Sequence, residues 1–236
     1  MSSQTRRAKY ARFRSAVDLV GGVAMIGAAV FLVWVNWPAG TEPPEPPVPK
    51  EPVSLEGAQL RGNNLAKFAI LEYSDFECPF CSRFAQDVFP AIDQTYIATG
   101  RLLFAFRHLP LEARHPNALK AAQASQCAAE TGRFWPMHEQ LFVNPKELAT
   151  EHLMAKARTV GLDMRQFERC LAGDTAADSI RADVRQAMTY GITGTPAFLF
   201  GELTPDRTLR VLRVQKGALP LAEFRAAIEA LLTRRS

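Results

Sequence analysis

The sequence predicts an α/β fold in which a parallel sheet is interrupted by a block of helices and preceded by a membrane-spanning segment. Two apolar, β-prone runs flank a helical segment, which is the spacing of a βαβ unit with a parallel sheet. Residues 116–190 then lack β-branched runs and are rich in Ala, Leu, Gln, Arg and Glu, which favours helices. Strand character returns after this block, so the helices form an insertion within the sheet domain.

The N-terminal element is a basic tail followed by an uncharged run. Residues 1–18 hold five basic residues and one acidic residue, which accounts for the formal net charge of +4. Residues 19–37 contain no charged residue and, as a helix, would span about 28 Å, close to the bilayer core of about 30 Å. Trp34 and Trp37 lie near the far end of this run, where indole rings prefer the interface. The sequence therefore predicts a transmembrane anchor.

The orientation of this anchor follows from its flanks. The basic flank precedes the apolar run, so the N-terminus is expected in the cytoplasm and the rest of the chain across the membrane. A cleaved signal peptide is the alternative. The exit from the run offers no small-x-small cleavage site, which favours an uncleaved anchor.

A proline-rich spacer follows the apolar run. Residues 38–52 hold seven of the sixteen prolines in the chain, so they can form neither a helix nor a central strand. We expect a semi-extended, solvated linker that separates the anchor from a domain at residues 53–236. From residue 19 onward, acidic and basic residues are equal in number, so we expect no surface for nucleic acid.

Periodicity and helix breakers give the elements of the domain. Strands are expected at residues 67–73, 101–108, 197–200 and 209–215. Helices are expected at residues 82–97, about 116–130, 133–143, 149–160, 164–171, 175–190 and 221–232. Gly132, Gly161 and Gly191 mark helix ends. Because residues 201–207 make only a turn, the last two strands are expected to form an antiparallel hairpin.

Cys78 and Cys81 are separated by two residues and stand between the first strand and the first helix. A thiol at a helix N-terminus lies near the positive end of the helix dipole and beside unpaired backbone N–H groups. That setting stabilises the thiolate, which is the nucleophile of disulfide exchange. The pair is therefore a candidate redox centre.

The other two cysteines, Cys127 and Cys170, stand alone on two different predicted helices. A zinc site would need a second short-spaced pair, so we expect no metal site. If the two helices pack together, these thiols form a structural disulfide, and two buried thiols are the alternative. All four cysteines lie in the part predicted to be exported, where oxidising conditions permit disulfides. The four histidines have no ligand spacing and are assigned no role.

Glu72 lies six residues before Cys78 and inside an apolar strand. A carboxyl group there is poorly solvated, so its pKa should rise. Near the second cysteine, such a group would accept and return a proton while Cys81 attacks a mixed disulfide. A glutamate that faces the sheet edge and has no role is the alternative.

Thr195 and Pro196 stand directly before the strand at residues 197–200. Proline is tolerated at the first residue of a strand because it need not donate to the ladder. An X-Pro bond can be cis, and a cis bond would expose the Thr195 backbone as an edge for an extended peptide. An ordinary turn is the alternative.

Together these segments resemble the DsbA-like thiol-disulfide oxidoreductases of the thioredoxin superfamily. The resemblance covers about residues 53–236, and it rests on the run from Glu72 to Cys81, on Gly132-Arg-Phe-Trp135 with His138, and on Gly194-Thr-Pro196. It implies a thioredoxin fold with a helical insertion at about residues 116–190. It also implies chemistry that requires no cofactor.

The resemblance also implies roles for single residues. Cys78 would be the exposed nucleophile, Cys81 the resolving thiol, Glu72 a buried acid and Pro196 a cis proline that faces the disulfide. Several members of the group carry a further disulfide in the helical insertion, which matches Cys127 and Cys170.

Two departures from the best-studied oxidases leave the direction of exchange open. Phe80 replaces the histidine that these oxidases have between the cysteines, and a phenyl ring cannot form a hydrogen bond to sulfur. Thr195 is also found before the cis proline of reductive and isomerase members.

We expect a single-pass protein of the bacterial inner membrane whose catalytic domain lies on the periplasmic side and forms disulfides in exported proteins. Its substrates would be unfolded chains with free thiols, held along the Thr195–Pro196 edge. A membrane redox partner would reoxidise Cys78 and Cys81. A reductase or isomerase of the same fold and a tethered holdase without redox turnover are the alternatives.

Overall fold

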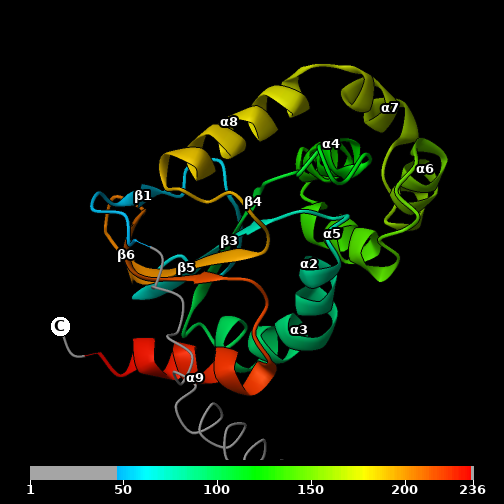
Figure 1. The fold of residues 1–236 in the computed structure, drawn as a ribbon. Coiled ribbons are helices and arrows are strands. Elements are labelled where there is room, and N and C mark those ends of the chain that lie inside the picture. Colours follow the sequence, from blue (N-terminus) through cyan, green and yellow to red (C-terminus); the bar gives the residue numbers. More distant parts are fainter. Residues whose placement is uncertain (1–46, 235–236) are drawn as a thin grey trace, which may run out of the picture. The chain divides into compact units, whose positions relative to one another are not determined.

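A computed structural model describes residues 47–234 of the chain. These residues form a six-stranded sheet in the order β1-β6-β5-β3-β4-β2, with helices on both faces (Figure 1). The pair β3 and β4 is parallel, and the other neighbouring pairs are antiparallel. The strands are β1 (Val53–Ser54), β2 (Gln59–Gly62), β3 (Phe68–Ser74), β4 (Leu103–His108), β5 (Ala197–Leu203) and β6 (Thr208–Lys216).

The central strand β3 is buried on both faces. Phe68 and Ile70 pack with the helix that follows β3 in the chain, whereas Leu71 and Tyr73 belong to the cluster on the opposite face. Because side chains alternate along a strand, Glu72 points to the same face as Phe68 and Ile70. The strand therefore directs its one carboxylate toward the helix that starts after Cys78.

That helix begins at Pro79, earlier than the predicted start at residue 82. It continues without a break through two π-helical stretches, as α2 (Pro79–Arg83), η1 (Phe84–Val88), α3 (Phe89–Ile92) and η2 (Asp93–Ile97). Pro90 lacks the N–H group that an α-helical ladder needs, and the wider turn at η1 precedes it. The helix connects β3 to β4 in parallel, which confirms the predicted βαβ unit.

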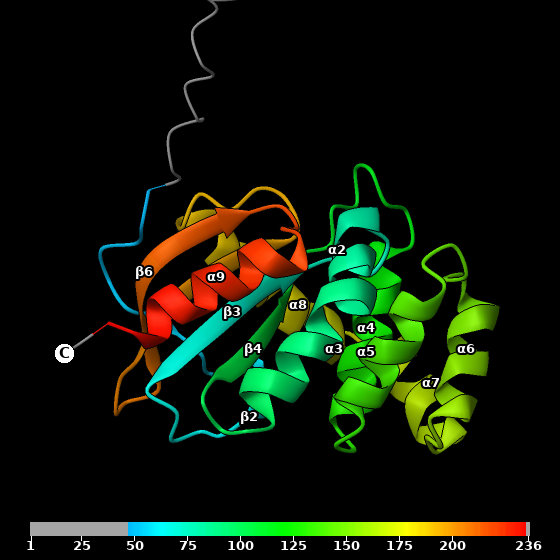
Figure 2. The same cartoon turned by 90° about the horizontal axis from the view of Figure 1, so that it is seen from below.

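The helical insertion contains α4 (Ala118–Ala129), α5 (Phe134–Val143), α6 (Thr150–Thr159), α7 (Met164–Ala172) and α8 (Thr175–Thr189), close to the predicted ranges. The first four share a hydrophobic cluster, which also takes in Cys78, Cys81 and Phe106, and they lie beside the sheet (Figures 1 and 2). Helix α8 instead returns over the sheet, where Val184 and Ala187 join the cluster under β3. The insertion is therefore a four-helix unit, and α8 completes the layer on one face of the sheet.

The C-terminal part confirms the predicted hairpin and final helix. β5 and β6 pair antiparallel and extend further into the turn than predicted. A Cβ atom on Gly201 would lie 2.3 Å from the Arg210 carbonyl oxygen. The backbones of β5 and β6 can therefore approach this closely only because residue 201 has no side chain. Helix α9 (Leu221–Leu232) covers the sheet face that also carries α2 and α3 (Figure 2).

Two short edge strands were not predicted. β2 is a polar four-residue segment that pairs with β4, and β1 pairs two residues with β6. Neither has enough alternating apolar residues to be recognised locally, because its strand conformation depends on the neighbouring strand.

The predicted basic tail at residues 1–18 and the predicted anchor at residues 19–37 lie outside the described residues. So does most of the predicted linker at residues 38–52, of which residues 47–52 contain no helix or strand. Within residues 47–234, no helix has both the length and the apolar character needed to cross a bilayer.

A buried ion pair joins β4 to α8. Arg107 and Asp183 are both buried, and their side chains form a salt bridge. The Arg107 guanidinium also donates to the carbonyl oxygens of Ser54 and Glu56, and the second Asp183 oxygen accepts from the His108 N–H at 3.0 Å. The pair therefore holds β4, α8 and the chain after β1 together.

Replacing Asp183 with asparagine should lower the free energy of unfolding by about 3–5 kcal/mol, because Arg107 would keep a buried charge without its counterion. Urea denaturation of the full chain measures this. The matched control is Asp178→Asn, since Asp178 forms an exposed pair with Arg181 and its loss should cost less than about 1 kcal/mol. Equal small losses in both variants would contradict the prediction.

Candidate thiol-disulfide site

Cys78 is the N-cap residue of α2, with extended backbone angles, and Pro79 occupies the first helical turn. The preceding turn is closed by a hydrogen bond from the Cys78 N–H to the Asp75 carbonyl oxygen at 3.1 Å. The helix start directs the backbone N–H groups of Phe80 and Cys81 at the Cys78 sulfur. The local sequence thus creates a site for a negative charge on that sulfur.

The pKa of Cys78 is lowered from 9.0 to about 6. The largest cause is a hydrogen bond from the Cys81 thiol, and the side chain of Thr195 and the two backbone N–H groups add to it against the opposing effect of burial. The pKa of Cys81 moves the other way, well above its usual value, because the thiol is buried and lies beside the Cys78 charge. At neutral pH one sulfur is therefore ionised and the other keeps its proton.

The expectation that Cys78 is exposed was wrong. The residue retains only 3% of its accessible surface, and Cys81 retains none. The cause is tertiary, because the Cys78 sulfur faces the Thr195 carbonyl oxygen at 3.4 Å instead of solvent. Phe80 is the part of the motif that reaches the surface, with about half of its area exposed.

The Thr195–Pro196 peptide bond is cis. It brings Thr195 to Cys78 at the start of β5, and the Pro196 carbonyl oxygen accepts from the Gly217 N–H at 2.8 Å. The Thr195 hydroxyl oxygen is buried and has no hydrogen-bond partner in the reduced site. This hydroxyl is a donor without an acceptor until the Cys78 thiolate forms.

Glu72 retains 2% of its accessible surface and lies on the β3 face that meets α2. The pKa of Glu72 is raised from 4.5 to about 8, chiefly by burial and in addition by the Cys78 charge, against the opposing effect of the Ser74 hydroxyl. The direction agrees with the sequence prediction. A carboxyl group with this pKa exchanges its proton near neutral pH.

A family model described as Thioredoxin matches residues 54–218. The chain belongs to the thioredoxin family.

Solved structures give the same result for the fold of this thioredoxin-family chain. The structure of alpha-DsbA1 from Wolbachia pipientis is 27% identical, with a TM-score of 0.66 over 76% of this chain and 93% of that chain. Oxidised BdbD from Bacillus subtilis is 22% identical, with a TM-score of 0.67 over 79% of this chain and 99% of that chain. The domain thus has the fold of the DsbA-like thiol-disulfide oxidoreductases, which confirms the resemblance.

Curated relatives match at higher identity over a smaller share of their length. Na(+)/H(+) antiporter NhaA 1 of Mycolicibacterium gilvum is 36% identical over 182 residues, which are 72% of this chain and 28% of the antiporter. Na(+)/H(+) antiporter NhaA 3 of Salinispora tropica is 36% identical over 147 residues, or 62% of this chain and 22% of the antiporter. The chain thus spans about a quarter of the length of these relatives.

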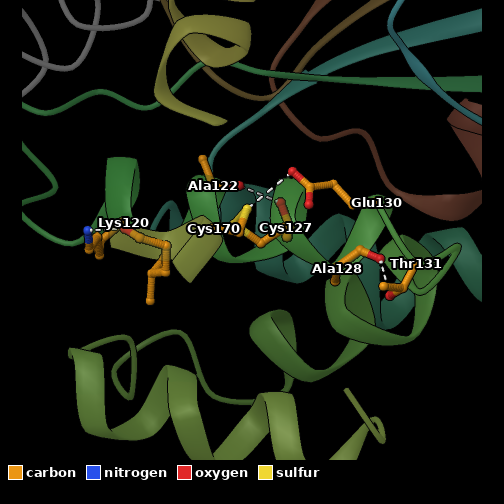
Figure 3. The surroundings of a disulfide bond; sticks show 9 residues. Lys120, Ala122, Cys127, Ala128, Glu130, Thr131 and Cys170 are labelled. Atoms are coloured by element: carbon orange, nitrogen blue, oxygen red, sulfur yellow. Dashed lines mark hydrogen bonds between the residues drawn. A yellow bond between two sulfur atoms is a disulfide. The ribbon is translucent and has the colours of Figure 1, made fainter. Parts of the chain in front are cut away.

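In this thioredoxin-family domain, Cys127 and Cys170 form a disulfide between α4 and α7, with an S–S distance of 2.02 Å. Figure 3 shows the bond beside Glu130, whose carboxylate oxygen lies 3.3 Å from the Cys170 sulfur. Cys78 and Cys81 are both free thiols. The structure therefore separates the four cysteines into a bonded pair within the insertion and a free pair at the start of α2.

Two carboxylates in the turn before Cys78 were not among the predicted site residues. Asp75 is buried and accepts from the N–H groups of Glu77 and Leu111 and from the His115 ring, each at 2.8 Å. Glu77 accepts from the backbone and the side chain of Asn117, at 2.6 and 3.1 Å. An aspartate that accepts from the backbone N–H two residues later is a common turn feature, but the other partners of these carboxylates come from the chain that leads into α4. These bonds fix the Cys78 turn against the helical insertion.

Two histidines without a predicted role lie in an aromatic cluster beside the site. His108 and His138 are fully buried, and burial lowers the pKa of each from 6.5 to about 3. Both rings contact Phe76, which precedes Cys78 by two residues. They are therefore neutral packing groups at physiological pH. Within residues 47–234, no group of three or more His, Cys, Asp or Glu residues is arranged to hold a metal ion.

Titration of the reduced protein should give one thiolate with a midpoint at about pH 6, because the Cys78 anion accepts hydrogen bonds that a free thiolate lacks. Thiolate ultraviolet absorbance measures it without requiring reagent access. The control is Cys78→Ser, in which the step near pH 6 should vanish. A midpoint near that of an ordinary thiol would contradict the prediction.

Replacing Thr195 with valine should raise the pKa of Cys78, because the hydroxyl that donates to the thiolate is lost while side-chain volume is nearly kept. The same absorbance titration detects the shift. Thr193 is exposed, so Thr193→Val is the matched control and should leave the midpoint unchanged. An unchanged midpoint in Thr195→Val would show that the hydroxyl does not reach the sulfur.

Proposed function

We propose that this protein is a membrane-anchored, extracytoplasmic thiol-disulfide oxidoreductase that forms disulfides in exported proteins through Cys78 and Cys81. The observation that carries the proposal is the contrast between two neighbouring thiols, one with a pKa of about 6 and the other with a raised pKa. An acidic thiol is both a good nucleophile and a good leaving group in disulfide exchange. Cys81 is buried and keeps its proton, so its sulfur is available to a disulfide at Cys78 and not to thiols in solution.

In the oxidase direction, the resting enzyme holds a Cys78–Cys81 disulfide. A substrate thiolate attacks the Cys78 sulfur, a substrate–Cys78 disulfide forms, and Cys81 leaves and gains a proton. A second substrate thiolate then attacks the substrate sulfur of this mixed disulfide, and Cys78 leaves as the stabilised thiolate. Two substrate thiols are oxidised to one disulfide and the enzyme dithiol is formed.

The low pKa of Cys78 favours this direction. Stabilising the thiolate stabilises the reduced enzyme, which makes its disulfide a stronger oxidant. The Phe80 ring gives the sulfur no hydrogen bond, so this stabilisation comes from Cys81, Thr195 and the backbone N–H groups of the helix N-terminus. A reductase or isomerase, in which the Cys78 thiolate attacks a substrate disulfide and Cys81 resolves the complex, is the second candidate.

Unfolded chains with free thiols are the proposed substrates. Thr195 lies against the Cys78 sulfur, so an extended peptide that pairs with the backbone there would present its own sulfur to Cys78. The exposed ring of Phe80, two residues after Cys78, would offer such a peptide an apolar contact. The exchange uses only sulfur and protons, so the proposal includes no cofactor.

A membrane location is supported by the uncharged run at residues 19–37 and by the relatives named as Na(+)/H(+) antiporters, in which a similar segment belongs to a membrane transporter. Cation transport is not proposed for this chain, because about three quarters of each antiporter has no counterpart in the match. We propose a single-pass anchor in the bacterial inner membrane, with the domain on the periplasmic side and a membrane redox partner that reoxidises Cys78 and Cys81.

Oxidation of a reduced peptide by the full-length chain, purified in detergent, should fall to the uncatalysed rate in Cys78→Ser, because the sulfur that accepts the attack is gone. Incubated instead with a peptide that contains a disulfide, reduced Cys81→Ser should accumulate a Cys78–peptide disulfide and release one peptide thiol, since the thiol that resolves this complex is missing. Mass spectrometry of the quenched reaction detects that adduct.

Two further outcomes distinguish the alternatives. Unchanged prevention of aggregation by Cys78→Ser, together with no peptide oxidation by the unmodified protein, would support the holdase. A reduction potential for the Cys78–Cys81 couple well below about −200 mV, measured against glutathione, would support the reductase instead of the oxidase.

A further inference from the structure

One buried polar group beside Cys81 has no role in the exchange described above. Ser74 is the last residue of β3 and retains 1% of its accessible surface. Its hydroxyl oxygen is enclosed and makes no hydrogen bond of ordinary geometry in the reduced protein. A buried hydroxyl without a partner is uncommon, because its desolvation is not compensated.

The strand geometry places this hydroxyl on the sheet face that carries two reacting groups. Ser74 is two residues after Glu72, so both side chains point to the β3 face that carries Phe68 and Ile70 and meets the helix of Cys81. Cys81 precedes Phe84, which packs on that same face, by about one helical turn. Glu72, Ser74 and Cys81 are all closed off from solvent.

The effects of Ser74 on its neighbours agree with this placement. The Ser74 hydroxyl lowers the pKa of Glu72 and also that of Cys81, so it acts on both groups. Glu72 acts on Cys81 through its charge and not through a hydrogen bond. The hydroxyl is therefore an uncharged group that influences both the carboxyl and the thiol.

The remaining ionisable neighbours do not compete for the proton. His108 pairs with Ser74 across β3 and β4, and burial keeps its pKa at about 3, so it stays neutral. Cys78 holds its charge toward Thr195 and the helix N-terminus. Glu72 is therefore the ionisable neighbour that can supply or accept the proton of Cys81.

We propose that the Ser74 hydroxyl relays the proton between the Glu72 carboxyl group and the Cys81 sulfur. This inference rests on the proposed exchange through Cys78 and Cys81. When substrate attacks the Cys78–Cys81 disulfide, Cys81 leaves as a thiolate, the Ser74 O–H proton moves to that sulfur, and the Glu72 proton moves to the Ser74 oxygen. The products are the Cys81 thiol, an unchanged serine and the Glu72 carboxylate. In the reverse step, Cys81 loses its proton by the same path and attacks the mixed disulfide.

The test measures how fast Cys81 resolves a Cys78–glutathione disulfide in the full-length protein. Ser74→Ala should slow glutathione release about tenfold or more, because proton transfer by a positioned group contributes at least that much. Ser74→Thr is the matched control, since it keeps the hydroxyl and should restore most of the rate. The double variant Ser74→Ala/Glu72→Gln should be no slower than Glu72→Gln alone, because both residues act in one path.

A role in packing would give a different pattern. Because the Ser74 hydroxyl has no partner, Ser74→Ala should melt at the same temperature as the unmodified protein or higher. The Cys78 thiolate titration should also stay unchanged in Ser74→Ala. Release at the unmodified rate in Ser74→Ala, or slowing that multiplies with that of Glu72→Gln, would overturn the relay and leave the exchange intact.

A second measurement needs no variant. In mixtures of light and heavy water, two protons moving together give a curved dependence of the release rate on deuterium content, and one proton gives a straight line. A straight line would overturn the relay. If the unmodified protein forms no Cys78–glutathione disulfide at all, the proposed function fails, and the relay fails with it.

Discussion

The contact between the Cys78 sulfur and the Thr195 backbone joins residues that are 117 positions apart in the chain. It brings the N-terminus of α2 against the start of β5, and the chemistry of the site depends on that closure. The helix end supplies backbone N–H groups to the sulfur, and Thr195 supplies a carbonyl oxygen for the thiol and a hydroxyl for the thiolate. The same closure removes both sulfurs from solvent, so these short-range bonds act where water does not screen them.

Burial and hydrogen bonding at this contact give Glu72, Cys78 and Cys81 different pKa values. Burial raises the pKa of Glu72 and of Cys81, while direct hydrogen bonds lower that of Cys78. A negative charge at Cys78 also disfavours ionisation of its two neighbours. The site therefore holds one charge at neutral pH, and exchange moves that charge from sulfur to sulfur.

The helical insertion supports this arrangement through polar bonds as well as apolar contacts. Asp75 and Glu77 connect the turn before Cys78 to the segment that opens α4, and α4 is bonded to α7 through Cys127 and Cys170. The cysteine motif packs in the same hydrophobic cluster as these helices. The insertion thereby holds the turn before Cys78 in place. Helix α8 then returns the chain to the sheet, where Thr195 contacts Cys78.

The sequence by itself determined the order and type of the main elements, the redox pair at a helix start and the raised pKa of Glu72. These features depend on local periodicity, on helix-breaking residues and on a charge inside an apolar strand, all of which short segments express. Only the tertiary structure decided that Cys78 is covered, that the Ser74 hydroxyl is enclosed without a hydrogen-bond partner, and that Asp75 binds the chain before α4. Desolvation and hydrogen bonding depend on which distant segments come into contact, and a local sequence pattern does not predict those contacts.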